Sequence, residues 1–128
     1  MSKTKIDWDV EPEAKDFEAA TNYLSLIFPD AKCKALLESL RAADKTVRAS
    51  KDLLRASNLP LLPRDDSHVD QNLKRIEKGK SLSPVLLIGG DMSRGIPLIV
   101  ADGHHRICAL YYIDESEPVE CRIASMKR

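Results

Sequence analysis

Residues 96–111, IPLIVADGHHRICALY, contain the change of pattern that decides the fold. The apolar run from Ile96 to Val100 predicts a strand buried on both faces. Residues 107–111 instead carry the apolar spacing of a helix. Between them lies the densest polar cluster of the chain, Asp102-Gly103-His104-His105-Arg106. The sequence therefore predicts a polar turn where a buried strand passes into a helix.

Both strands and helices are predicted around this junction. Four more are predicted: an edge strand at Leu59–Pro63, a helix with Val69, Leu73 and Ile76 on its buried face, a second buried strand at Val85–Ile88, and a final strand at Val119–Ala124. Residues 89–95 predict a turn or hairpin loop between the two buried strands. The order strand, helix, strand, strand, helix, strand is typical of an α+β fold.

The first 57 residues predict a separate helical subdomain. Apolar residues recur at three- and four-residue steps from Glu13 to Phe28, and Pro29 should end that helix. The pattern resumes from Asp30 to Ser57, as one long helix or as two shorter ones with a break at residues 44–46. This front part shows no catalytic pattern. The domains expected are therefore residues 1–57, helical, and residues 58–128, the α+β core.

Composition narrows the possible partners. The chain has 128 residues, and its 20 Lys and Arg balance its 20 Asp and Glu, so a basic DNA-binding face is not expected. Its apolar runs are shorter than the roughly 20 residues that span a bilayer, and the N-terminus lacks a signal-peptide pattern. Three cysteines without a CxxC pair indicate a reducing compartment. We therefore expect a cytoplasmic protein without membrane or DNA contact.

The turn at residues 102–106 has the chemistry of an anion site. A helix that begins here offers free N–H groups and the positive end of its dipole. Gly103 would let a phosphate approach, Arg106 could clamp it, and His104 and His105 add donors that titrate near neutral pH. Asp102 could accept a hydroxyl proton or orient a metal ion. The alternative is a plain helix cap, in which Asp102 or Gly103 caps the helix and Arg106 pairs with a surface carboxylate.

Residues 59–126 resemble the ParB/sulfiredoxin-like superfamily. The likeness rests on Pro84–Ile88, on the turn at residues 102–106 and on the closing run Pro118–Ile123. The complete chain is similar to small bacterial ParB-like proteins. The resemblance implies a ParB/sulfiredoxin-like core at residues 58–128, preceded by the helical subdomain. Because ParB proteins read DNA with a separate helix-turn-helix domain, it does not add a DNA-binding role here.

The resemblance also implies roles for the turn. The equivalent turn holds ATP phosphates in sulfiredoxins and CTP phosphates in ParB proteins, and it serves phosphoryl transfer in free serine kinases. Carried over, Gly103, His105 and Arg106 would contact the phosphates of ATP or CTP bound with Mg²⁺. Asp102 and His104 would be the catalytic residues, with a small hydroxyl compound as acceptor. Because sulfiredoxins have their nucleophilic cysteine where this chain has His104, sulfinic-acid reduction is not expected.

Several alternatives stay open. The domain could hydrolyse the nucleotide, transfer its phosphate, or act without turnover as a nucleotide-gated module. It could also bind a protein partner through its helical front, which an exposed apolar patch at Phe17, Leu24 or Leu40 would favour. Residues 64–68 are a second candidate loop, where Asp66 or His68 could serve as acid or base or where Asp66 or Ser67 simply caps a helix. Further candidates are a zinc site at His68, His104, His105 and Cys108, and a reactive thiol at Cys108 or Cys121.

Overall fold

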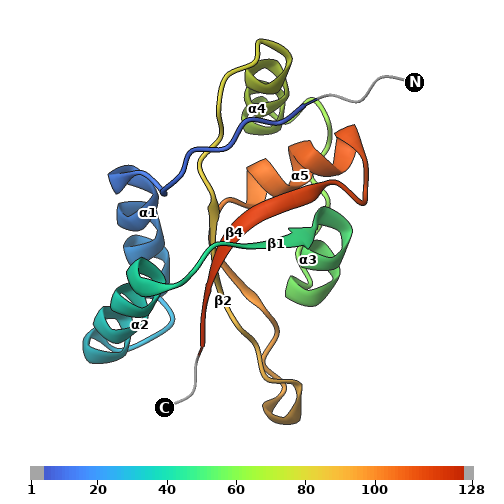
Figure 1. Ribbon diagram of the computed structural model, residues 1–128. Helices are drawn as coiled ribbons and strands as arrows, with labels where there is room; N and C mark the ends of the chain where they lie inside the picture. Colours follow the sequence, from blue (N-terminus) through green and yellow to red (C-terminus); the bar gives the residue numbers. More distant parts are fainter. Residues whose placement is uncertain (1–4, 126–128) are drawn as a thin grey trace.

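The computed structural model describes residues 5–125, so the outermost residues of both predicted domains, 1–4 and 126–128, lie outside it. This part of the chain forms five α-helices and one four-stranded mixed sheet, an α+β architecture (Figure 1). The helices are α1 (Ala14–Leu24), α2 (Asp30–Ala42), α3 (Ser50–Ser57), α4 (Ser67–Glu77) and α5 (His104–Ile113), and a single 3-10 turn, η1, covers Met92–Arg94. The strands are β1 (Thr46–Ala49), β2 (Val85–Ile88), β3 (Ile99–Asp102) and β4 (Pro118–Ala124).

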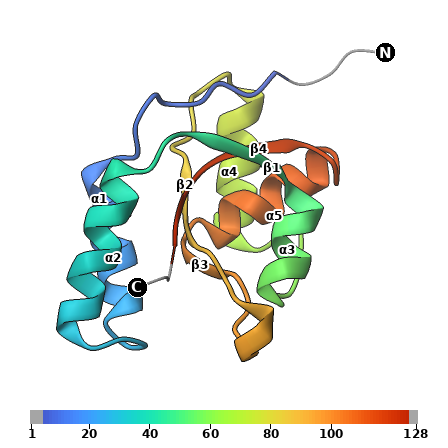
Figure 2. The ribbon, with the colours of Figure 1, turned by 60° about the horizontal axis from the view of Figure 1, so that its bottom comes forward.

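The sheet lies between two layers of helices. Its strand order is β1-β4-β2-β3, with β2 parallel to β4 and the other two pairs antiparallel. The helices α1 and α2 cover one face, and α3, α4 and α5 lie on the other side (Figure 2). This arrangement buries the central strands from both sides.

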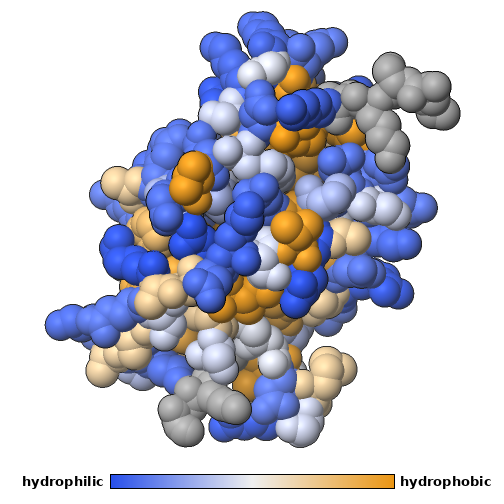
Figure 3. Space-filling view, in the orientation of Figure 1, coloured by the Kyte–Doolittle hydropathy of each residue, from blue (hydrophilic) through white to orange (hydrophobic). Residues whose placement is uncertain are grey.

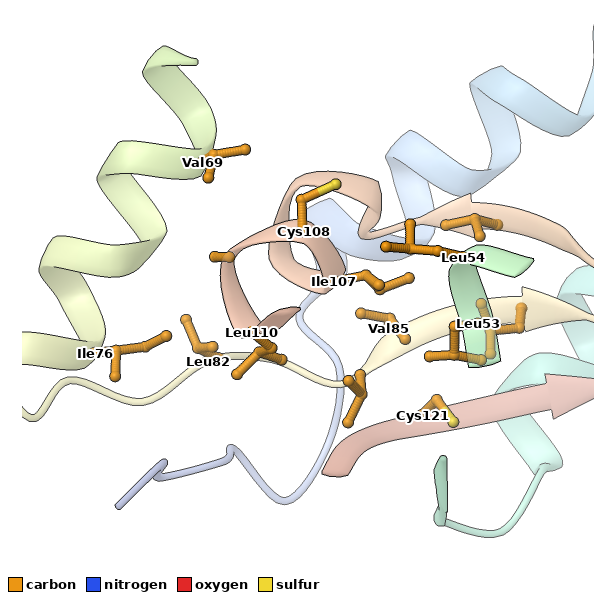
Figure 4. Packing of buried hydrophobic residues seen from close by; sticks show 14 residues of the cluster. Leu53, Leu54, Val69, Ile76, Leu82, Val85, Ile107, Cys108, Leu110 and Cys121 are labelled. Carbon is orange, nitrogen blue, oxygen red and sulfur yellow. The ribbon is translucent and has the colours of Figure 1, made fainter. Parts of the chain in front are cut away.

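The predicted strand at Val85–Ile88 is confirmed as β2, and all four of its residues are fully buried. Val85 and Leu87 pack in one cluster with α5, whereas Leu86 and Ile88 pack in another with α1 and α2. This alternation follows from the two-residue period of a strand. Figure 4 shows the first cluster, to which α3 adds Leu53 and Leu54, α4 adds Val69 and Ile76, and α5 adds Ile107 and Leu110. β2 therefore links the two hydrophobic clusters.

The first 57 residues are not helical throughout. The chain does break at residues 44–46, but Thr46–Ala49 then forms β1, which pairs with β4 from Thr46 opposite Cys121 to Ala49 opposite Pro118. Ser50 begins α3 directly afterwards, and its backbone N–H donates to the Glu117 carbonyl. The segment assigned to the helical front therefore supplies an edge strand of the same sheet.

Two other strand predictions need correction. Residues 59–63, predicted as an edge strand, are irregular in structure because Pro60 and Pro63 have no N–H to donate to a ladder. The strand expected at residues 96–100 is shifted to Ile99–Asp102, since Pro97 likewise interrupts pairing. Only an isolated bridge between Asp91 and Ile96 closes the hairpin loop before it. The first helix also ends earlier than expected, at Leu24.

Candidate functional site

The turn at residues 102–106 joins β3 to α5, as expected. Asp102 is the last residue of β3, Gly103 is the N-cap of α5, and His104, His105 and Arg106 form the first helical turn. Gly103 has no side chain that could cap the helix, so the N–H groups of that turn receive no bond from the N-cap residue. The Gly103 N-cap agrees with the helix-cap reading and leaves the N-terminus available to an anion as well.

Gly103 is required by local packing. Its φ is +117°, a left-handed conformation that glycine adopts without strain. A Cβ at this position would lie 2.7 Å from the Cβ of Val85 in β2. The absent side chain thus lets the turn pack against the central strand, a reason for glycine other than the approach of a phosphate.

Arg106 points into the protein and has several partners. Its Nη1 donates to the Ser83 carbonyl and to the Ser83 hydroxyl, at 2.6 Å each, and more distantly to the Pro84 carbonyl. Its Nη2 donates to Oδ2 of Asp102 at 2.5 Å. Only 11% of the Arg106 side chain is exposed. The pairing with Asp102 is therefore partly buried, unlike the surface pair of the helix-cap reading.

A second carboxylate reaches the same guanidinium from α1. Oδ1 of Asp16 lies 3.7 Å from Nη2 of Arg106, and the Asp16 side chain is 7% exposed. Oδ2 of Asp16 accepts the backbone N–H of Glu13, which forms a capping box at the start of α1. Sequence reasoning missed Asp16 and Ser83 as members of the site. The capping-box spacing of Glu13 and Asp16 was visible, but it did not indicate a partner 90 residues away.

Burial raises the pKa of Asp102 to about 6, despite the opposing effect of Arg106. Charge repulsion from the Asp16 carboxylate and a hydrogen bond with it contribute to the same increase. Two carboxylates thus share one guanidinium in a poorly hydrated place. Asp102 consequently titrates much closer to neutrality than an ordinary aspartate.

All three histidines of the chain gather at the exposed side of the turn. The rings of His68 and His105 are 4.8 Å apart, and those of His104 and His105 are 6.0 Å apart. Nε2 of His105 lies 3.8 Å from Oδ2 of Asp66. Burial lowers the pKa of His105, and Asp66 opposes that effect. His105 is therefore held mainly in its neutral form near pH 7.

The loop at residues 64–68 does face this turn. Oδ2 of Asp66 accepts the N–H groups of His68 and Val69, so Asp66 is the N-cap of α4, as the capping alternative predicted. These bonds, led by that from Val69, lower the pKa of Asp66. His68 and His105 are each the second residue of their helix. The N-termini of α4 and α5 therefore meet at the histidine cluster.

His104 has a defined hydrogen bond. Its Nε2 lies 2.9 Å from the Pro60 carbonyl oxygen, which can only accept, so Nε2 must carry the proton. In the neutral ring this assignment leaves Nδ1 with its lone pair. Nδ1 of His104 can therefore accept a proton from a bound group.

A polar pocket of about 310 Å³ adjoins the turn on the α4 side. It contains Arg106 and Asp16, and Gln71 and Asn72 line it one turn along α4 from His68. The remaining lining residues are Glu13, Lys15, Arg75, Ser81, Leu82 and Ser83. A larger pocket of about 580 Å³ lies between α3 and α5. The histidines line neither pocket, and of the two only the smaller one includes a residue of the turn, Arg106. The chemistry therefore favours the smaller pocket.

The alternative sites gain no support. Cys108 and Cys121 are fully buried, and burial raises both thiol pKa values, that of Cys121 to about 11. No group of three or more His, Cys, Asp or Glu side chains within residues 5–125 is arranged to hold a metal ion. The alternative zinc site at His68, His104, His105 and Cys108 is therefore not formed there, because Cys108 lies in the core.

The apolar residues that could have formed a surface for a protein partner are buried in the protein core. Phe17, Leu24 and Leu40 are 9%, 0% and 0% exposed, and they pack between α1, α2 and the sheet. On the face shown in Figure 3, hydrophobic side chains lie in several separate places among hydrophilic ones.

The helices described between residues 5 and 125 are all too short or too polar to cross a bilayer.

Comparisons with protein-family models, with curated proteins and with solved structures find no match to this chain. The assignment of a function therefore depends on the geometry of the site.

Proposed function

We propose that this chain binds the phosphate groups of a nucleoside triphosphate, ATP or CTP with Mg²⁺, at the N-terminus of α5. The core would be a ParB/sulfiredoxin-like domain, as the sequence resemblance implies. One observation carries the proposal: the rings of His68 and His105, each in the first turn of its helix, lie 4.8 Å apart. Two helix N-termini and three imidazoles thus converge on one exposed place.

The N-termini of α4 and α5 differ in the charge and the hydrogen bonds that their N-cap residues supply. Each helix N-terminus has a partial positive charge of roughly half a unit. At α4 the Asp66 carboxylate already takes the first N–H groups. At α5 the N-cap is Gly103, which brings neither a charge nor a bulky group. An anion would therefore bind at the N–H groups of His104, His105 and Arg106, with imidazole donors beside them.

The rest of the nucleotide would lie along α4. The 310 Å³ pocket shares Arg106 with the turn and continues past Gln71 and Asn72, whose side chains carry both donors and acceptors. Mg²⁺ would arrive bound to the phosphates, since it commonly retains substrate phosphates and waters as ligands. Arg106 would contribute its charge from the pocket wall, while its hydrogen bonds to Ser83 and Asp102 hold the turn in place.

Turnover would use His104 and Asp102. Nδ1 of His104 can accept the proton of an attacking hydroxyl or water while Nε2 stays bonded to the Pro60 carbonyl. Asp102, which titrates near neutrality, would hold Arg106 in register. The catalytic reading is phosphoryl transfer to a small hydroxyl compound, or hydrolysis. The non-enzymatic reading is a binding module that closes on the same ligand.

Calorimetry tests the proposal. MgATP, MgCTP and MgGTP are titrated into the wild type and into His68→Ala, His105→Ala and Arg94→Ala. Arg94 is an exposed cation in η1, away from the turn, and serves as the matched control. We expect ATP or CTP to bind, with about tenfold weaker affinity for either histidine variant because a donor is lost. Equal affinity in all four proteins, or no binding by any nucleotide, would contradict the proposal.

A product assay then separates the enzyme from the binding module. Release of inorganic phosphate, or loss of triphosphate in the presence of a small hydroxyl compound, would establish turnover. The His104→Gln variant should bind but lose that activity, since the amide can still donate to the Pro60 carbonyl and is not a base. Binding without any product would favour the nucleotide-gated module.

A further inference from the structure

The N-terminal helix α1 contributes a charged residue to the candidate site. Asp16 lies on α1, outside the segment that carries the family resemblance, yet its carboxylate is buried against Arg106. Both oxygens of the Asp16 carboxylate have a partner, because Oδ2 accepts the Glu13 N–H and Oδ1 faces Arg106. The neighbouring Phe17 and Ala20 pack into the cluster that contains Leu86 and Ile88 of β2. Asp16 is thus held in place by the capping box and by the core.

The charges around Asp16 and Asp102 do not balance. Both carboxylates use Nη2 of Arg106, so the three groups together carry one net negative charge when both acids are ionised. Other charged groups line the same pocket, but they are directed elsewhere. Lys15 pairs with Glu13 at 3.7 Å, and Arg75 donates to the Ser81 carbonyl at 2.7 Å. Arg106 is the cation that contacts the pair.

We propose that Asp16 is a positioning residue of the site, and that the Asp16–Asp102 pair takes up one proton from solvent when a polyanion binds at the N-terminus of α5. This inference rests on the proposed function. An incoming phosphate adds negative charge near a cluster that already has one unneutralised carboxylate. Protonation of one carboxylate oxygen removes that charge, and the neutral acid can donate to the other carboxylate while Arg106 keeps its bonds. The helical front would thereby couple ligand binding to pH.

The pair is already close to taking up this proton. Burial and the Asp16 carboxylate raise the pKa of Asp102 to about 6 in the absence of any ligand. At neutral pH a small further increase is enough to protonate the pair in a large share of molecules. Of the three histidines at the exposed side of the turn, His105 has a lowered pKa and would need a larger change, and all three stay in place when Asp16 is replaced. The pair is therefore the expected source of linked proton uptake.

A ligand-free measurement tests the pair by itself. The side-chain carboxyl carbons of aspartate are followed by NMR as pH is varied in the wild type, Asp16→Asn and Glu18→Gln. Glu18 is an exposed acid on the same helix and is the matched control. We expect the Asp102 titration midpoint to fall toward the ordinary aspartate value in Asp16→Asn and to stay unchanged in Glu18→Gln. An unchanged midpoint in Asp16→Asn would overturn the inference whether or not a nucleotide binds.

Calorimetry tests the coupling to the ligand. MgATP and MgCTP are titrated near pH 7 in buffers with different heats of ionisation, which reports the protons taken up on binding. We expect net uptake in the wild type and Glu18→Gln, reduced at least twofold in Asp16→Asn. Binding with no proton uptake, or with equal uptake in Asp16→Asn, would overturn the inference while leaving the proposed function intact. Failure of both nucleotides to bind would contradict the proposed function and the coupling together.

Discussion

Nη2 of Arg106 donates to Oδ2 of Asp102 at 2.5 Å, one helical turn earlier in the chain. The bond spans the junction between β3 and α5, and Nη1 of the same guanidinium bonds both oxygens of Ser83 just before β2. The arginine expected from the sequence to clamp a ligand thus holds the turn closed and fastens it to the segment preceding the central strand.

Replacement of Arg106 should therefore cost stability. Arg106→Ala leaves the buried carboxylates of Asp102 and Asp16 without their cation, and we expect a loss of about 3–5 kcal/mol in the free energy of unfolding. Urea denaturation at neutral pH measures it. Arg94→Ala, at an exposed position, should stay within about 0.5 kcal/mol of the wild type. A loss below about 1 kcal/mol for Arg106→Ala would contradict this account of the network.

Stability should depend on pH through Asp102. Its pKa is raised to about 6 when folded, against about 3.9 in an unfolded chain. Its protonated form therefore stabilises the fold fully below about pH 3.9, and this contribution is lost as pH rises through 6. Between about pH 4 and 7 the wild type should lose about 2 kcal/mol relative to Asp102→Asn. Urea unfolding of both proteins across that range provides the test, and a constant difference would disprove it.

Substitution of Gly103 separates the effect of a steric clash with Val85 from the effect of backbone strain at positive φ. Gly103→Ala places a methyl group 2.7 Å from Cβ of Val85 at φ +117°, whereas Gly79→Ala meets nothing within 4 Å at φ +73°. Both variants carry backbone strain of about 1 kcal/mol, and only Gly103→Ala adds a clash of about 1–3 kcal/mol. Thermal or urea denaturation should show a larger loss of stability for Gly103→Ala than for Gly79→Ala. Equal destabilisation would mean that the turn can move away from β2.

The thiols should be unreactive in the folded protein. Cys33, Cys108 and Cys121 are all buried, and burial raises the pKa values of Cys108 and Cys121. Because the thiolate is the reacting form, we expect a thiol reagent to label all three only when the chain unfolds. The labelling rate with and without urea measures this. Rapid labelling of Cys108 in the native state would reopen the reactive-thiol alternative.

Much of the fold followed from local pattern. The unbroken apolar run at Val85–Ile88 predicted a strand buried on both faces, because helices on both sides of a sheet leave no polar face. The turn at residues 102–106 was found because a dense polar cluster interrupts two apolar segments. β1 was not predicted, since its four residues, TVRA, are too few to show a two-residue period and the residues of β4 that pair with them lie 69 to 75 positions later in the chain.

The sequence pattern also did not predict which charged side chains are buried. Arg122 lies in the middle of β4, and the sequence pattern gave no indication of its burial. In the structure it is 6% exposed, and its guanidinium bonds the carbonyls of Ala43 and Val10 and the Glu11 carboxylate. Asp16 is a similar case. Both residues act through partners that only the tertiary fold brings close.

NMR can locate the phosphates that we propose to bind at the N-terminus of α5. Backbone amide signals of the wild-type protein are followed while MgATP or MgCTP is added. We expect the largest shifts at His104, His105 and Arg106, the first N–H groups of α5, and at His68 of α4 beside them. Saturating shifts confined to other residues, such as Lys51 and Arg55 in the large pocket by α3, would contradict this proposal, as would no shift at all.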